Sequence, residues 1–133
     1  MRAGIIATCA ATLLVSSCDD PCGNRPVDEV VSPDGERSAV LFVRDCGATT
    51  GYSLQMSLVP TGADLPNDGG NVLILGDGSG WAAGEPTSDA VIGRWTSETT
   101  LELVLTEPKE NIIFLAESVE GVMIRRSAKR EDR

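Results

Sequence analysis

RSAVLFVRDCGATTGYSLQMSLV, residues 37–59, contains the two clearest strand patterns of the chain and the segment that joins them. Ala39–Val43 is apolar at every position, which is typical of a strand covered on both faces. From Tyr52 to Val59 apolar and polar side chains alternate, which predicts a strand with one buried and one wet face. The connection is rich in small residues and carries Cys46. We therefore expect residues 37–44 to form a central strand with residues 52–59 beside it.

Further strand patterns lie on both sides of this stretch. Ser32-Pro33-Asp34-Gly35 predicts a turn, because Pro fixes φ at the second position and Gly can take positive φ. Residues 27–31 then form a hairpin with the central strand. Later strand candidates are residues 71–75, 90–95, 99–106, 112–116 and 122–125, with loops rich in Gly, Pro and Asp at 60–70 and 76–89. Residues 112–119 could form a short helix instead.

These patterns predict an all-β protein. We expect a single small antiparallel β domain of six to eight strands, built as a sandwich or as a curled meander sheet. The 133 residues suffice for one domain. The expected organisation is a lipoprotein signal peptide at 1–17, a lipidated tether at 18–26, the β domain at 27–126 and a charged C-terminal tail at 127–133.

The N-terminus resembles that of a bacterial lipoprotein. Arg2 is followed by an apolar run from Ala3 to Val15, which has the length of a secretory signal and is shorter than the roughly 20 residues of a membrane span. The run ends in Val-Ser-Ser-Cys, which resembles a lipobox with Cys18 as the acylated residue. An ordinary secretory signal and an uncleaved anchor are the alternatives. The expected location is the bacterial cell envelope, with the domain lipid-anchored in the membrane and facing the periplasm or the exterior.

The four cysteines divide into two groups. Cys9 lies inside the apolar run and Cys18 is the expected lipidation site. Cys22 and Cys46 remain, and an even pair in an exported protein predicts a disulfide. A reactive thiol at Cys46, with its pKa lowered by nearby Arg44, is the alternative.

Composition restricts the chemistry. The chain contains no histidine, so catalytic triads and dyads that use histidine are excluded. The formal net charge is −9, which argues against nucleic acid as a partner. Asp64, Asn67, Asp68 and Asn71 could offer oxygen atoms to calcium, but Leu75 stands where an EF-hand loop requires Glu. We expect no catalytic residues, no cofactor and no metal site.

Two tryptophans are candidates for different roles. Trp95 lies at the end of a strand candidate and is expected in the core. Trp81 lies in the loop at 76–89 and is a candidate contact surface, although a loop folded over the sheet would bury it.

Several segments together resemble a family of small uncharacterised bacterial exported proteins. They are Ser-Pro-Asp-Gly at 32–35, Arg-Asp-Cys-Gly-Ala-Thr-Thr at 44–50 and Met-Ser-Leu at 56–58. The resemblance covers roughly residues 22–105 and implies a small β domain without a known activity.

The sequence thus favours a non-catalytic envelope lipoprotein that binds or scaffolds an unidentified envelope protein. Two alternatives stay open. One is a small envelope enzyme that uses carboxylates or the Cys46 thiol, and the other is an inhibitor or immunity-like lipoprotein.

Overall fold

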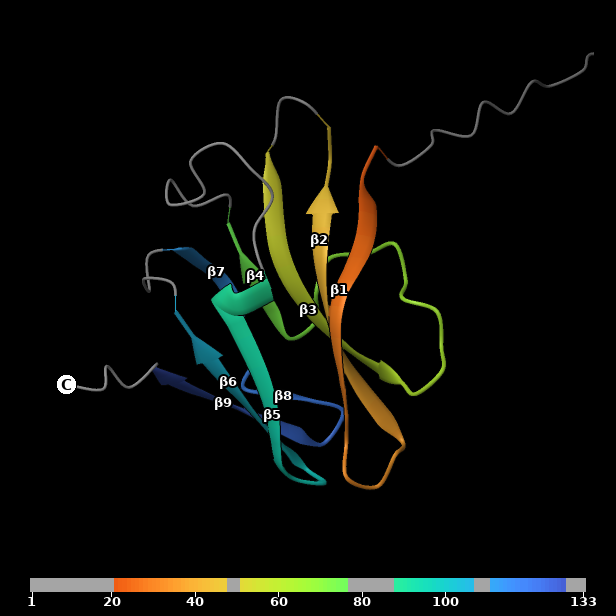
Figure 1. Cartoon of the computed structure of the whole chain (residues 1–133), viewed down its shortest axis with the longest axis vertical. Helices are drawn as coiled ribbons and strands as arrows, with labels where there is room; N and C mark the ends of the chain where they lie inside the picture. The colour runs from red at the N-terminus through yellow and green to blue at the C-terminus, as the bar shows by residue number, and fades with distance from the viewer. Residues whose placement is uncertain (1–20, 48–50, 77–87, 107–110, 129–133) are drawn as a thin grey trace, which may run out of the picture.

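The computed structural model describes residues 21–47, 51–76, 88–106 and 111–128, which form nine strands in two sheets (Figure 1). Sheet A contains, in spatial order, β1 (Gly23–Val31), β2 (Arg37–Asp45), β3 (Tyr52–Pro60), β4 (Leu73–Leu75) and β7 (Ile112–Leu115). Sheet B contains β5 (Val91–Ser97), β6 (Thr100–Leu105), β9 (Val122–Ala128) and β8 (Ser118–Val119). A short 3-10 turn, Ser88–Ala90, precedes β5.

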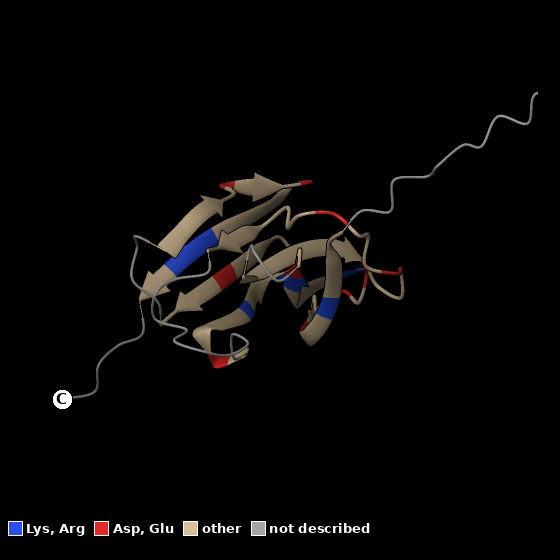
Figure 2. Ribbon diagram, turned by 90° about the horizontal axis from the view of Figure 1, so that it is seen from above, with Lys and Arg blue, Asp and Glu red and all other residues tan. Residues whose placement is uncertain are grey.

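The two sheets pack face to face around one core, so the protein is a β sandwich (Figure 2). Leucine, valine, isoleucine, methionine and alanine side chains from both sheets form this core. Sheet A contributes alternate residues of β2 and β3 and the two ends of β4, and sheet B contributes Val91, Leu101, Leu103, Leu105, Val122 and Ile124. The all-β prediction is confirmed, and of the two predicted forms the sandwich is the one observed.

The predicted centre of sheet A is also observed. β2 lies between β1 and β3, and each of its residues from Ser38 to Val43 is buried. The Ser32–Gly35 turn joins β1 to β2, with the Gly35 N–H donating to the Ser32 carbonyl oxygen at 2.9 Å and Gly35 at φ 76°. The apolar run of this strand therefore faces the core on one side and a second covering layer on the other.

The second layer is the segment 61–72, which folds back over the outer face of sheet A. Gln55 and Ser57 on that face are only 5% and 6% exposed. The Gly70 N–H donates to Gln55 Oε1 at 2.6 Å, and the Asn71 N–H donates to Ser57 Oγ at 3.3 Å. The prediction of a wet face on β3 is therefore wrong, because its polar side chains hydrogen-bond the backbone of this covering loop.

Sheet B departs from the predicted antiparallel arrangement in one pair. β6 and β9 are parallel, with Leu101 opposite Ile124 and Leu103 opposite Arg126. A parallel pair needs a long crossover between its strands. The chain supplies it by leaving sheet B after β6, adding β7 to sheet A, and returning through β8.

Two boundaries, one element type and the number of strands also differ from the sequence prediction. β1 begins at Gly23, inside the segment expected to be a tether, and β9 continues to Ala128. Residues 112–119 contain the strands β7 and β8, so the helical alternative is wrong. With β8 counted, the described strands number nine where six to eight were expected.

Candidate functional site

A disulfide joins Cys22 to Cys46 at one end of sheet A. Cys22 directly precedes β1 and Cys46 directly follows β2, and Gly23 pairs with Asp45 in the register of these strands. Strand pairing alone therefore brings the two cysteines together across a sequence separation of 24 residues. This pair is the one expected from the cysteine count. A sulfur in a disulfide provides no free thiolate, so the bond argues against the thiol chemistry considered for Cys46.

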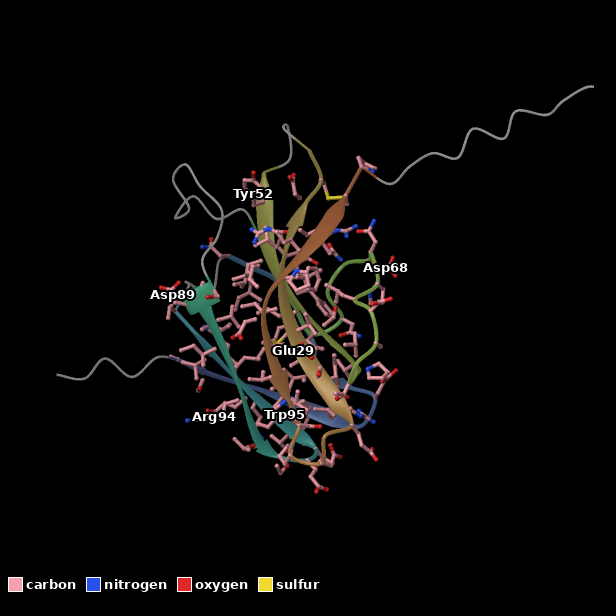
Figure 3. All side chains as sticks on the ribbon, turned by 45° about the vertical axis from the view of Figure 1, so that its right-hand side comes forward. Glu29, Tyr52, Asp68, Asp89, Arg94 and Trp95 are labelled. Atoms are coloured by element: carbon pink, nitrogen blue, oxygen red, sulfur yellow. A yellow bond between two sulfur atoms is a disulfide. The ribbon has the colours of Figure 1, made fainter. Side chains whose placement is uncertain are left out.

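A cavity of about 360 Å³ lies at the same end. The described residues that line it are Asp45, Gly47, Gly51 and Tyr52, and Tyr52 is labelled in Figure 3. Asp45 Oδ1 accepts a hydrogen bond from the Gly47 N–H at 2.9 Å, and Gly47 has φ 110°. We assign no ligand to this cavity.

The covering loop is tied to sheet A by three polar side chains. The Asn24 side-chain amide donates to the carbonyl oxygens of Pro66 and Asp68 at 3.0 and 2.8 Å. The Arg44 guanidinium donates to Asn24 Oδ1 at 2.8 Å and to Asn67 Oδ1 at 3.3 Å. The Asn67 amide donates in turn to the Cys22 carbonyl oxygen at 2.9 Å. These contacts fix the backbone of residues 66–68 against β1 and β2.

The covering loop also ends in an unusual edge contact. Of the residues in β3, only 54–56 pair with β4. Beyond that point the Asn71 side chain replaces a strand, because Leu58 N–H donates to its Oδ1 at 2.8 Å and its Nδ2 donates to the Leu58 carbonyl oxygen at 3.2 Å. At Leu58 the edge of β3 therefore has a side chain rather than a strand as its neighbour.

A second cavity, of about 350 Å³, opens along this edge. We call it the edge groove. It is lined by Ser57–Pro60 of β3, by Pro66, Asp68, Gly69 and Asn71 of the covering loop, and by Glu120 of the turn between β8 and β9. Asp68 is labelled on the covering loop in Figure 3, on the opposite side of β1 from Asp89. The edge groove is therefore lined by apolar and acidic residues from three separate parts of the chain.

Two of the four oxygen-rich loop residues have structural roles. Asn67 and Asn71 use their side chains to hold the covering loop, as described above. Among the described residues no group of three His, Cys, Asp or Glu side chains could hold a metal ion. The calcium hypothesis considered for Asp64, Asn67, Asp68 and Asn71 is not supported by this geometry.

One carboxylate has a clearly shifted pKa. The pKa of Asp34 lies below its ordinary value because the Ser32 hydroxyl donates a hydrogen bond to its carboxylate, and the Glu36 N–H donates a second. Both bonds belong to the turn between β1 and β2. The two hydrogen bonds that lower this pKa therefore stabilise the turn, and the shift does not indicate a catalytic acid.

The remaining candidates from the sequence have different outcomes. Cys18 and Trp81 lie outside the described residues. Trp95 on β5 is partly buried against the core, and its Nε1 donates to the Val30 carbonyl oxygen at 3.0 Å, which connects sheet B to β1. Within the described ranges, no helix is long and apolar enough to span a membrane.

The comparisons with known proteins give no relative. No family model, no curated protein and no solved structure matches the chain.

Proposed function

We propose that the protein is a lipid-anchored module of the bacterial cell envelope, acylated at Cys18, which binds or scaffolds another envelope component and catalyses no reaction. The disulfide is the observation that carries this proposal. Disulfides form and persist in oxidising compartments such as the periplasm and the cell surface. Cys22–Cys46 agrees in this respect with the signal-like N-terminus and the Val-Ser-Ser-Cys segment that ends at Cys18.

The proposed anchor has a geometric consequence. Cys22 lies four positions after Cys18, and an extended chain spans at most about 3.5 Å per residue. The disulfide end of sheet A would then lie within about 14 Å of the acylated cysteine. The turns at the other end of the sandwich, such as Ser32–Gly35 between β1 and β2, would point away from the membrane and toward a partner (Figure 1).

The test is the intact mass of the protein extracted from native membranes, with thiols alkylated before and after reduction. We expect the mass of a chain that begins at Cys18 and carries acyl groups, with two alkylated thiols appearing only after reduction. A chain that begins elsewhere without acyl groups would refute the anchor. A Cys46 that is alkylated without reduction would refute the oxidising compartment and restore the thiol hypothesis.

The binding role has a separate test. Trp81 is the contact residue proposed from the sequence, so Trp81→Ala should remove one or more proteins from a crosslinked pulldown of the anchored protein. The far-ultraviolet circular dichroism of the variant serves as the control for folding. An unchanged set of crosslinked proteins with an unchanged spectrum would exclude Trp81 from the contact surface.

A further inference from the structure

The covering loop is held on sheet A by two separate sets of hydrogen bonds. Its later part, residues 70 and 71, is bonded to β3, through the side chains of Gln55 and Ser57 and the backbone of Leu58. Its earlier part, residues 66–68, is bonded to side chains of β1 and β2 and to the residue just before β1. The two parts of the loop therefore depend on different strands.

The bonds of residues 66–68 lie next to the disulfide. Asn24 and Arg44 face each other one position inside the end of the β1–β2 ladder. The Asn24 amide donates to the loop carbonyl oxygens at positions 66 and 68. Asn67 donates to the carbonyl oxygen of Cys22, one of the two disulfide cysteines. We call this set of hydrogen bonds the latch, and it rests on the end of the ladder that the disulfide closes.

The disulfide restrains this end of the ladder. Local opening costs little free energy at a frayed end and approaches the full free energy of unfolding in core strands. The Cys22–Cys46 bond joins the two chains just beyond the last register pair, Gly23 with Asp45. Both cysteines are partly exposed, so a small dithiol can reach the bond. Cleavage of the bond should therefore let the residues that form the latch fray.

The covering loop hides an apolar surface of β2. Val40 and Phe42 alternate along this strand with the core residues Ala39, Leu41 and Val43, so they face the outer side of sheet A. They are nevertheless only 6% and 0% exposed. Displacement of the loop would therefore expose apolar side chains at the centre of sheet A.

We propose that the Cys22–Cys46 bond is a redox switch that controls the latch. A dithiol reductant supplies two electrons and two protons, so that the S–S bond breaks, both cysteines become thiols and the reductant forms its own disulfide. The end of the β1–β2 ladder then frays, the latch opens and residues 66–68 leave the outer face of sheet A. Residues 70 and 71 stay bonded to β3. A dithiol oxidoreductase is the class of partner that would operate this switch.

The experiment is 1H–15N spectroscopy of the full chain in micelles of an uncharged detergent, before and after addition of dithiothreitol. The side-chain amide signals of Asn24 and Asn67 report the latch directly, because both groups donate within it. On reduction they should shift toward the positions of solvent-exposed asparagines. The backbone order parameters of Asn67 and Asp68 should fall from about 0.85 to below about 0.6. Those of Gly70 and Asn71 should stay near about 0.85.

Two asparagine variants test the assignment in the oxidised protein. Asn67→Asp removes the donor to the Cys22 carbonyl oxygen, so residues 67 and 68 should become more mobile although the disulfide is intact. Asn71→Asp is the matched control, because it makes the same change at the other set of bonds. Reduction should still release residues 67 and 68 in this control.

The double variant Cys22→Ser with Cys46→Ser controls for the reductant. It should show the loop mobility of the reduced wild type, and dithiothreitol should not change it. The remaining signals of each spectrum report whether a variant is folded, and the wild-type comparison does not depend on any variant.

Two results would overturn the proposal. One is a wild-type protein whose latch signals and loop order parameters are the same in the oxidised and reduced states. The other is a reduced protein in which residues 70 and 71 become as mobile as residues 67 and 68, since the bond would then hold the whole loop or the whole domain. Failure of the lipid anchor would appear only in the mass measurement and would leave this comparison unaffected.

Discussion

Removing the Cys22–Cys46 bond should destabilise the protein by an amount that depends on the length of the loop that the bond closes. The bond closes a loop with a sequence separation of 24 residues. In the chain-entropy account, cross-linking a loop of this length stabilises the native state by about 3.5 kcal/mol. The register of β1 with β2 stays intact without the bond, because these strands pair from Gly23 with Asp45 to Val31 with Ser38. We therefore expect a folded but weakened domain.

The assay is urea unfolding followed by tryptophan fluorescence, for the wild type, Cys22→Ser, Cys46→Ser and the double variant. With an m-value of about 1.5 kcal/mol/M, the midpoint should fall by about 2.3 M in all three variants. Wild-type protein in reductant should unfold at the same midpoint as the variants. Equal midpoints are the most specific part of the prediction, because either substitution, like reduction, removes the same bond.

Two results would refute this reasoning. A midpoint shift below about 0.5 M would show that residual structure already restrains the loop in the unfolded state, or that the bond adds little to stability. A Cys46→Ser variant that is much less stable than Cys22→Ser, or that alone loses a cellular phenotype, would assign Cys46 a role beyond the bond.

Three further predictions use the same unfolding assay. Gly70→Ala should lower the free energy of unfolding by about 1–3 kcal/mol, because the added Cβ would lie 2.6 Å from the Leu73 carbonyl oxygen. An unfolding midpoint equal to that of the wild type would contradict the tight packing of the covering loop. Leu73→Ala should lower the free energy of unfolding by about 2–5 kcal/mol because this side chain is fully buried. Ile113→Ala, at a side chain that is 69% exposed, should lower it by less than about 0.5 kcal/mol. Equal losses of stability in the two variants would refute the core assignment. The hydrogen bonds to the Asp34 carboxylate lower its pKa in the folded state, so they stabilise the fold above the unfolded pKa of about 4, and this contribution is lost as the pH falls through the lower folded pKa. Asp34→Asn should therefore flatten the dependence of stability on pH below about pH 4, whereas an unchanged slope would contradict the stabilising role of the Ser32 hydrogen bond.

The strands were predictable because their side-chain patterns reflect burial on a two-residue period. The leucines of β6 follow that rule in the structure, whereas residues 39–43 of β2 are buried at every position because this strand is covered on both faces. The start of β1 was not predictable from composition, because Pro26 and the charged residues around it argue against a strand. The pairing with β2 and the adjacent disulfide hold this segment extended all the same.

The outer layer could not be predicted from periodicity. Alternation shows that Gln55 and Ser57 share a face, but it does not show whether water or a loop backbone donates hydrogen bonds to their side chains. The parallel pairing of β6 with β9 depends on the course of the intervening chain through sheet A, which no local pattern encodes.

The residues that line the edge groove could not be predicted from local sequence patterns either. Asp68 is one of several oxygen-bearing residues that the sequence places in one loop, whereas no sequence pattern singles out Glu120. Their proximity follows from the position of the β8–β9 turn beside the end of β3, which is a property of the sandwich. A sequence can indicate which side chains are exposed, but the relation between two turns of different sheets needs the assembled fold.

The position of the disulfide also determines how the domain responds to mechanical force. Tension on the residues before Cys22 would, without the bond, peel β1 from β2 one pair at a time, beginning at Gly23 and Asp45. The bond joins these two strand ends covalently, so the force passes into β1 and β2 together. Gly23 and Asp45 cannot then separate first, and β1 is thereby protected from being unzipped from β2 by a pull on the N-terminal segment.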